Sequence, residues 1–361
     1  MTQITKNQHF VPKCLLKNFL SNDQSINIYD SSRRKLRPPT IVDRVLAENY
    51  FYDKDNLVEN FLAEHIEAPA SKVLKVFRNE EPAAPINAES HIAIVRFLLV
   101  QLSRTPSAHQ TSITNIDNLF GELIRQIGQL NDFDEDVIDS VKFSLNDPKD
   151  VLRTETLDAA LKVPLILDLE WHFLINGTAT DFVISDNPVI NYNWYLRNSD
   201  KIDKTALTKR GTQIFLPISK NITLCLYDSK VYKMGSKHSH YTTISAESDV
   251  RLLNELQFRS RRSYIVFASI EAANYVLSEC EKIPSNSLYA HKVNSQMTVT
   301  GNEQVKSRIV QWREPHIFSS WLSFCKIKSK LLKRGLCSDN RQPEILKEHY
   351  EYISKVRENA L

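Results

Sequence analysis

Hydrophobic periodicity changes midway along this chain of 361 residues, and the change limits the fold more than any other feature. In the first 165 residues, apolar side chains recur mainly at three- and four-residue spacing, which predicts helices. Further on, short runs in which apolar and polar residues alternate predict strands. The sequence therefore predicts an α+β fold, in which a mostly helical N-terminal half packs on a mixed or antiparallel sheet from the second half.

The expected elements fall into two groups that meet near residue 285. In the first group we expect helices over 56–77, 88–103, 110–130, 134–145, 151–162, 246–259 and 271–280, and strands over 26–29, 49–52, 181–185, 212–218, 221–227 and 263–268. In the second group we expect a strand near 297–299 and helices over 318–333 and 342–357. We therefore predict an α+β domain over 1–285 and a mostly helical C-terminal appendage over 286–361.

The composition excludes several classes of protein. The seven glycines are not spaced as a P-loop or a dinucleotide fold requires, so the chain has no nucleotide cofactor motif. The five cysteines form no C-x-x-C pair, which argues against a disulfide framework and a zinc site. The longest apolar run, residues 92–102, contains Arg96 and is too short to span a bilayer. Because the first ten residues also lack the apolar core of a signal peptide, we expect a cytoplasmic protein without membrane association.

Basic residues gather in two places, although the formal net charge is only +3. Residues 325–334 contain five lysines and arginines and no acid, and residues 259–262 contain three arginines. A basic helix over 318–333 would present Lys326 and Lys330 to nucleic acid or to an acidic partner, so both lysines are candidate substrate-binding residues. The alternative is that both clusters are solvated faces.

The N-terminal segment contains a histidine that Pro12 and an apolar run hold in place. His9 is a candidate general acid, general base or ligand, and Gln8 beside it is a candidate substrate-binding residue. The alternative is a histidine that only hydrogen-bonds a backbone carbonyl.

Two glutamates lie on the helix expected over 56–77. At ~100° per residue, Glu59 and Glu67 project about 80° apart in a regular helix. Glu67 follows Ile66 at the edge of the apolar stripe, where a carboxylate must be paired, metal-bound or protonated. Glu67 is therefore a candidate catalytic or metal-binding residue, and the alternative is a solvated helix face.

Two further patterns place polar groups at the ends of elements. Gln101 and Arg104 are three residues apart and share one face at the end of a helix, where the arginine can pair with a buried glutamate or bind phosphate. Asp186 and Asn187 follow the strand over 181–185, a common position both for site residues and for an Asx turn. Arg104 and Asp186 are candidate catalytic residues, Asp186 is also a candidate metal ligand, and Gln101 and Asn187 are candidate substrate-binding residues.

Together these patterns resemble an uncharacterised prokaryotic family, domain of unknown function 4238. The resemblance spans about residues 5–280 and rests on residues 8–19, 51–52, 59 and 67, 101–106, 171, 182–188, 211–217 and 253–254. It implies a spacing of seven between the two glutamates, whereas they are eight apart here. Similar members occur in bacterial and phage-satellite genomes among anti-phage defence genes, so the resemblance implies a defence effector or sensor.

Two functions stay open, and with them the question of whether the chain is an enzyme. A hydrolytic, nuclease-like effector would use His9 as acid or base and Arg104 to stabilise phosphate charge. Its metal, a candidate divalent cofactor, would be held by Glu67 and Asp186. A non-enzymatic sensor of a phage component would instead bury these groups in a closed polar network and signal through a partner. Candidate partners are nucleic acid, a phage protein and a second copy of the chain, and four side chains are expected to converge: His9, Glu67, Arg104 and Asp186.

Overall fold

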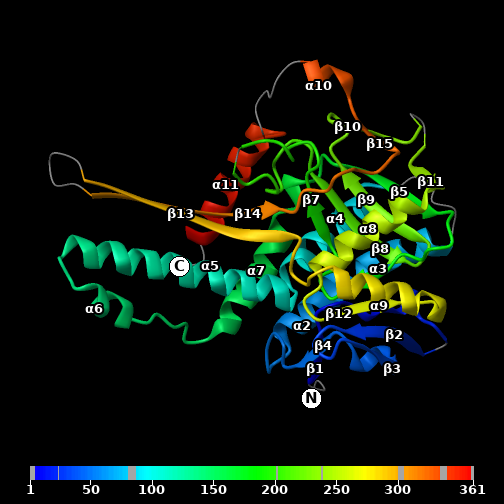
Figure 1. Ribbon diagram of the computed structural model, residues 1–361, viewed down its shortest axis with the longest axis horizontal. Coiled ribbons are helices and arrows are strands. Elements are labelled where there is room, and N and C mark those ends of the chain that lie inside the picture. Colours follow the sequence, from blue (N-terminus) through cyan, green and yellow to red (C-terminus); the bar gives the residue numbers. More distant parts are fainter. Residues whose placement is uncertain are drawn as a thin grey trace.

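The computed structural model describes residues 5–22, 24–79, 87–200, 202–236, 239–299, 305–333 and 340–358. The chain forms helices along its whole length and several β-sheets, which confirms the α+β class. Figure 1 shows a body that contains the larger sheets and an arm that extends from it. The arm consists of α5 (Pro106–Leu130), α6 (Glu135–Ser140) and the hairpin of β13 (Tyr289–Val299) and β14 (Val305–Pro315).

Two sheets form the body. The larger is a mixed sheet with the strand order β11 (Tyr241–Ile244), β5 (Glu170–Asn176), β9 (Ile222–Tyr227), β8 (Gln213–Ser219) and β7 (Ile190–Tyr192). The smaller is antiparallel, with the order β3 (Lys35–Ile41), β2 (Ser25–Asp30), β12 (Tyr264–Phe267) and β6 (Ile184–Ser185). Because β6 ends at Ser185 and β7 begins at Ile190, the residues between them carry the chain from one sheet to the other.

Strands β2 and β3 of the N-terminal half belong to the smaller sheet, so the predicted arrangement is not confirmed. β2 pairs with β12, which comes from the second half of the chain, so the first half is not only a helical layer on a separate sheet. Every residue of β2 is buried, as expected for a strand in the interior of a sheet that is covered on both faces.

Helices and short strands complete the body. The longer helices are α3 (Ala68–Asn79), α4 (Ala88–Ser103), α7 (Pro148–Leu161), α8 (Glu247–Ser260), α9 (Ala273–Lys282) and α11 (Pro343–Glu358). The short ones are α1 (Lys13–Leu16), η1 (Lys17–Phe19), η2 (Val42–Arg44), α2 (Leu57–Phe61), the π-helix η3 (Leu62–Glu67), η4 (Val163–Leu165), η5 (Ile270–Ala272) and α10 (Ser329–Lys333). The remaining strands form two small sheets: β1 (Asn7–His9) pairs with β4 (Ala47–Asn49), and β10 (Tyr232–Met234) pairs with β15 (Cys325–Ile327).

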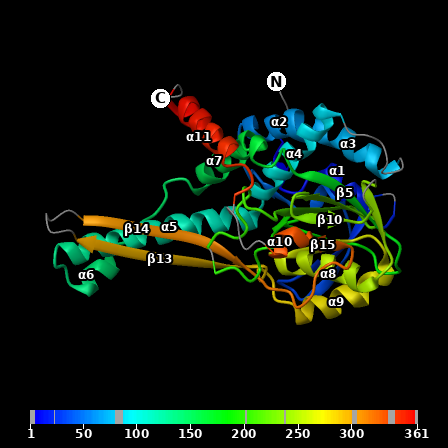
Figure 2. The same ribbon diagram turned by 90° about the horizontal axis from the view of Figure 1, so that it is seen from above.

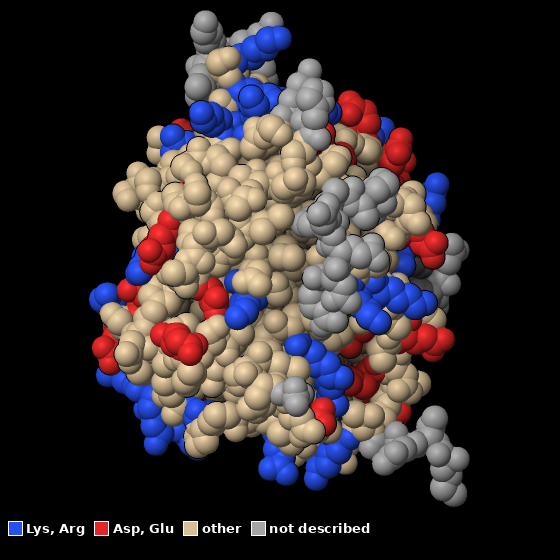
Figure 3. Space-filling model, turned by 90° about the vertical axis from the view of Figure 1, so that its right-hand side faces the viewer, with Lys and Arg blue, Asp and Glu red and all other residues tan. Residues whose placement is uncertain are grey.

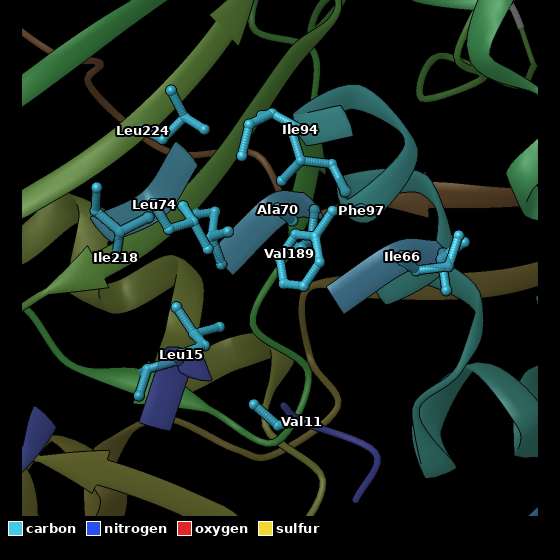
Figure 4. Packing of buried hydrophobic residues seen from close by; sticks show 14 of the residues in the cluster. Val11, Leu15, Ile66, Ala70, Leu74, Ile94, Phe97, Val189, Ile218 and Leu224 are labelled. Atoms are coloured by element: carbon cyan, nitrogen blue, oxygen red, sulfur yellow. The ribbon is translucent and has the colours of Figure 1, made fainter. Parts of the chain in front are cut away.

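The main hydrophobic core lies around α4. Most residues between Ile94 and Gln101 are buried, which places this helix inside the body rather than on its surface. Figure 4 shows Ile94 and Phe97 of α4 together with Leu74 of α3 and Ile218 of β8, so helices and the larger sheet share one core. This packing fixes the end of α4, which carries Gln101 and is followed by Arg104.

The helix predicted over 318–333 is wrong. The segment contains the strand β15 and then the five-residue helix α10. Cys325 is buried and Lys326 is exposed, so burial follows the two-residue period of a strand. Lys326 and Lys330 are both exposed, but they lie on different elements and share no helical face.

The C-terminal residues are attached to the body through several contacts, among them a strand pairing and an ion pair. β15 pairs with β10, and Arg341 forms an ion pair of 3.0 Å with Asp168. This region also holds the long hairpin β13–β14, where only a strand near 297–299 was expected. A boundary at residue 286 stays a prediction. Within the described ranges, no helix is both long and apolar enough to cross a membrane.

Candidate functional site

Arg104 is the centre of a buried polar network at the end of α4. Its side chain is 1% exposed, and its Nε donates to Oε1 of Gln101 at 2.9 Å, which confirms that the two residues share a face. The Nε of Arg104 and the Nε2 of Gln101 also donate to the carbonyl of Phe10, at 3.3 and 2.8 Å. Since both side chains hold one backbone carbonyl, they fasten the N-terminal segment to the helix end.

Glu67 completes this network from the opposite helix. Nη1 of Arg104 donates to Oε1 of Glu67 at 2.8 Å, and the Glu67 side chain remains 26% exposed. Among the described residues, Nη2 of Arg104 is buried and has no hydrogen-bond partner. A buried guanidinium N–H without an acceptor is costly, so the Arg104 network has one donor that an added acceptor would satisfy.

Glu59 approaches the same corner because the helix between the two glutamates is not regular. Residues Leu62–Glu67 form a π-helix, whose wider turn accommodates one extra residue. The extra residue offsets the divergence of about 80° that a regular helix would impose over eight positions. Burial raises the pKa of Glu59 to about 7, and repulsion from Glu67 acts in the same direction, whereas Arg104 opposes it. Sequence reasoning noted the eight-residue spacing of Glu59 and Glu67 but did not place Glu59 among the candidate site residues. That unusual spacing was the sign of the irregular helix that brings Glu59 to Arg104.

His9 and Gln8 hold backbone groups. The Nε2 of His9 lies 3.2 Å from the carbonyl oxygen of Val42; because a carbonyl only accepts, Nε2 carries the hydrogen. Burial lowers the pKa of His9, so the ring is neutral at pH 7. Gln8 donates to the carbonyl of Asp53 at 2.9 Å and accepts from the backbone N–H of Tyr52 at 2.8 Å. Both side chains therefore fix the N-terminal segment in place.

Asp186 lies in the crossover between the two sheets, and its carboxylate binds the turn that follows α8. Its carboxylate accepts backbone N–H groups from Arg262, Ser263 and Tyr264, at 2.8, 2.6 and 3.1 Å. Burial raises the pKa of this carboxyl to about 6, although the three hydrogen bonds oppose the shift. Asn187, the next residue, accepts from the hydroxyl of Thr105 at 3.0 Å.

Direct hydrogen bonds join some of the predicted site residues. Arg104 donates to both Glu67 and Gln101, and His9 precedes Phe10, whose carbonyl Arg104 and Gln101 hold. Asp186 is followed by Asn187, whose side chain accepts from Thr105, the residue after Arg104. The carboxylates of Glu67 and Asp186 are already engaged by N–H donors, and in the described part of the chain no three His, Cys, Asp or Glu side chains gather as a metal site would require.

A cleft of about 580 Å³ lies on the other side of the α4–α5 junction, and the sequence did not reveal it. Its walls come from α4, α5, α7, the end of α8 and the base of the β13–β14 hairpin. Asn187, predicted to bind substrate, lines it. The charged side chains that line the cleft are Glu155, Lys162, Asp203, Arg259, Arg262 and Arg313.

Positive charge exceeds negative charge in this cleft. Arg259 pairs with Glu255 at 2.7 Å, whereas Lys162, Arg262 and Arg313 form no ion pair within the described residues. Arg262 is held by the carbonyl of Pro106, at 2.9 Å, and Arg313 stands 4.9 Å from the ring centre of Tyr289. Sequence reasoning noted the arginines of residues 259–262 but could not place Arg313 beside them.

The face of the body opposite the arm carries both basic and acidic side chains. Figure 3 shows that face with lysines and arginines interspersed with acids around a broad uncharged surface.

The chain is an α+β protein with a buried polar network at one side of a helix junction and a basic cleft at the other. Its residues 7–271 match the family described as "Protein of unknown function (DUF4238)", and the chain belongs to this family. This match confirms the resemblance inferred from the motifs. No curated protein and no solved structure matches the chain.

Proposed function

We propose that this protein binds nucleic acid, with phosphate groups of the strand held in the basic cleft. The observation that carries the proposal is the convergence of Lys162, Arg262 and Arg313 on one cavity of about 580 Å³. A cavity of this size accommodates a ligand of nucleotide dimensions, and guanidinium groups bind phosphate oxygens through paired hydrogen bonds.

Two further features support a nucleotide unit rather than a bare anion. Trp312 and Tyr289 line the cleft, and aromatic side chains stack on bases without regard to sequence. Asn187 adds an amide at the same wall. The cleft therefore combines phosphate-binding and base-stacking groups.

The test is fluorescence anisotropy with a labelled 20-nucleotide single strand. The full chain should bind it with an affinity that falls as salt rises, and Arg262→Glu with Arg313→Glu should weaken binding by about tenfold or more and reduce the salt slope by about two. The charge-matched control is Lys35→Glu with Lys54→Glu, two exposed lysines outside the cleft, which should leave affinity within about threefold. Competition by unlabelled ATP distinguishes a free nucleotide from a strand as the preferred ligand. Equal affinities of the cleft variant and the control would contradict the proposal.

A hydrolytic, nuclease-like effector is the second candidate. It is favoured by Glu59, a half-buried carboxyl whose pKa of about 7 suits a general acid or base, next to the Glu67–Arg104 pair. The matched test compares cleavage of the bound strand by the native chain, Glu59→Gln and Glu64→Gln, where Glu64 is an exposed glutamate of the same helix. Cleavage that Glu59→Gln leaves unchanged would contradict a catalytic role.

The biological setting that we propose is defence against phage, as the family resemblance implies. Expression of the chain should lower phage plating efficiency, and the cleft variant should not. Equal protection by the two would separate any defence role from the cleft.

A further inference from the structure

The β13–β14 hairpin forms most of one side of the arm. Its two strands have eleven residues each and pair in register from Tyr289↔Pro315 to Val299↔Val305. At ~3.3 Å per residue the ribbon is about 36 Å long, close to the ~34 Å of one turn of B-DNA. Figures 1 and 2 show it lying along α5 and projecting away from the sheets.

One face of the ribbon is used to contact α5. The Nε2 of Gln126 donates to the hydroxyl of Ser295 at 2.5 Å, and the Nε2 of Gln311 donates to the carbonyl of Asn115 at 2.8 Å. Ser295 and Gln311 point to the same side, because directly paired residues share a face and alternate residues return to it.

The opposite face contains four exposed polar residues, together with the half-buried Val310 and Trp312. Alternation places Lys292, Asn294 and Gln296 of β13 there, together with Arg308 of β14, and all four are exposed. Arg308 lies directly across from Gln296. Among the described residues of this face, the carboxylate is that of Glu314 at the base, and Lys204 neutralises it at 2.6 Å.

These four residue types are those that recognise base edges. Arginine and lysine donate to guanine, and asparagine and glutamine form paired hydrogen bonds with adenine in the major groove. The groove is about 12 Å wide and admits a two-stranded ribbon, whereas the deep, narrow major groove of RNA duplexes does not. If this face served only for solubility, it would not require amides between the cations. If it bound an acidic protein, the cations alone would suffice.

We propose that the exposed face of the β13–β14 ribbon enters the major groove of duplex DNA and reads base edges through Asn294, Gln296 and Arg308. The inference rests on the proposed function, because Trp312, which lies across from Lys292 on this face, also lines the cleft. Trp312 therefore links the exposed face to the cleft, whereas His291 and Arg313 line the cleft from the α5 side of the ribbon.

The experiment compares a 30-base-pair duplex with a single strand as anisotropy probes for the full chain. The ribbon variant Lys292→Glu with Arg308→Glu should bind the duplex at least about tenfold more weakly and bind the single strand within about threefold of the native chain. The charge-matched control, Lys35→Glu with Lys54→Glu, should retain duplex affinity, and circular dichroism checks that each variant is folded.

Selection from a duplex library with a randomised centre tests base reading separately. The native chain should enrich a short preferred sequence, and Asn294→Ala with Gln296→Ala should lose that preference while keeping most of the affinity. Binding of single strands but not of duplex, or equal duplex affinity of the ribbon variant and the native chain, would overturn the ribbon inference alone. Failure to bind either probe would overturn the proposed function and the ribbon inference together.

Discussion

Arg104 and Glu67 show how a single ion pair joins segments that are distant in the sequence. The guanidinium connects the end of α4, the N-terminal segment and the π-helix through hydrogen bonds to Gln101, Phe10 and Glu67. Among the ion pairs of the described residues, the negatively charged partner of Arg104 is Glu67. Removal of the arginine therefore leaves a half-buried carboxylate and a buried amide without their donor.

We predict that Arg104→Ala lowers the free energy of unfolding by about 2–4 kcal/mol, because breaking a buried pair strands its partners. Urea unfolding measures the change. The matched control is Arg125→Ala, whose exposed ion pair with Asp139 at 3.6 Å should contribute less than about 1 kcal/mol. Similar losses for the two variants would show that the Arg104 network does not hold the fold.

Glu59 predicts a pH dependence of stability. Its pKa is raised from 4.5 to about 7, so between these values the folded chain binds more protons than the unfolded chain. The contribution of Glu59 to stability is therefore fully present below about pH 4.5 and is lost as pH rises through about 7. Glu59→Gln should stabilise the protein at pH 8 relative to the native chain and have little effect at pH 4.5.

Thermal midpoints across this range measure the Glu59 effect, with Glu64→Gln as the control on the same helix. An identical pH profile for Glu59→Gln and the native chain would contradict the shifted pKa.

At the scale of elements, the π-helix and the sheet crossover are two irregular segments that position polar side chains. The π-helix η3 absorbs one residue, so that Glu59 and Glu67 both approach Arg104. The crossover between β6 and β7 has an aspartate whose carboxylate receives three backbone N–H groups of the turn after α8. Both devices place polar side chains where the regular elements would not bring them.

We predict that deleting Ala63, an exposed residue of the π-helix, is tolerated. The deletion converts the wide turn to a regular helix and leaves the residues on both sides in their present orientation. The control is deletion of Lys72, an exposed residue of α3, which rotates Val73 and Leu74 about 100° out of the core. Thermal melts should show a midpoint near the native value for the first deletion and loss of folding for the second. The reverse order would refute the assigned role of η3.

We predict that Asp186→Ala destabilises the protein by about 3 kcal/mol or more, because each of three N–H groups loses its acceptor. Asn187→Ala removes one side-chain acceptor and should cost about 1 kcal/mol. Melting and strand binding are measured together. If Asp186→Ala abolishes strand binding while the melting midpoint is unchanged, the carboxylate is a site residue and does not support the crossover.

At the scale of the whole molecule, sequence reasoning succeeded where a pattern is local. The hairpin of β8 and β9 and the shared face of Gln101 and Arg104 follow from short-range periodicity. It failed for 318–333, because a run rich in lysine has helical propensity but Cys325 is buried as part of a strand. The cleft could not be predicted, since Arg262 and Arg313 are brought together only by tertiary packing.

The arm allows the two proposed binding regions to be separated in one variant. We predict that replacing residues 292–312 by a two-residue Asn-Gly turn leaves the body folded, because the strands of the ribbon pair with each other and not with the body sheets. The thermal midpoint should stay within a few degrees of the native value. His291 and Arg313 remain in this variant but the stacking residue Trp312 is lost, so single-strand affinity should fall by about tenfold, while duplex affinity falls to the level of a non-specific contact. A variant that keeps duplex affinity would place DNA binding elsewhere on the body, and one that loses both affinities while folded would mean that the cleft depends on the whole ribbon.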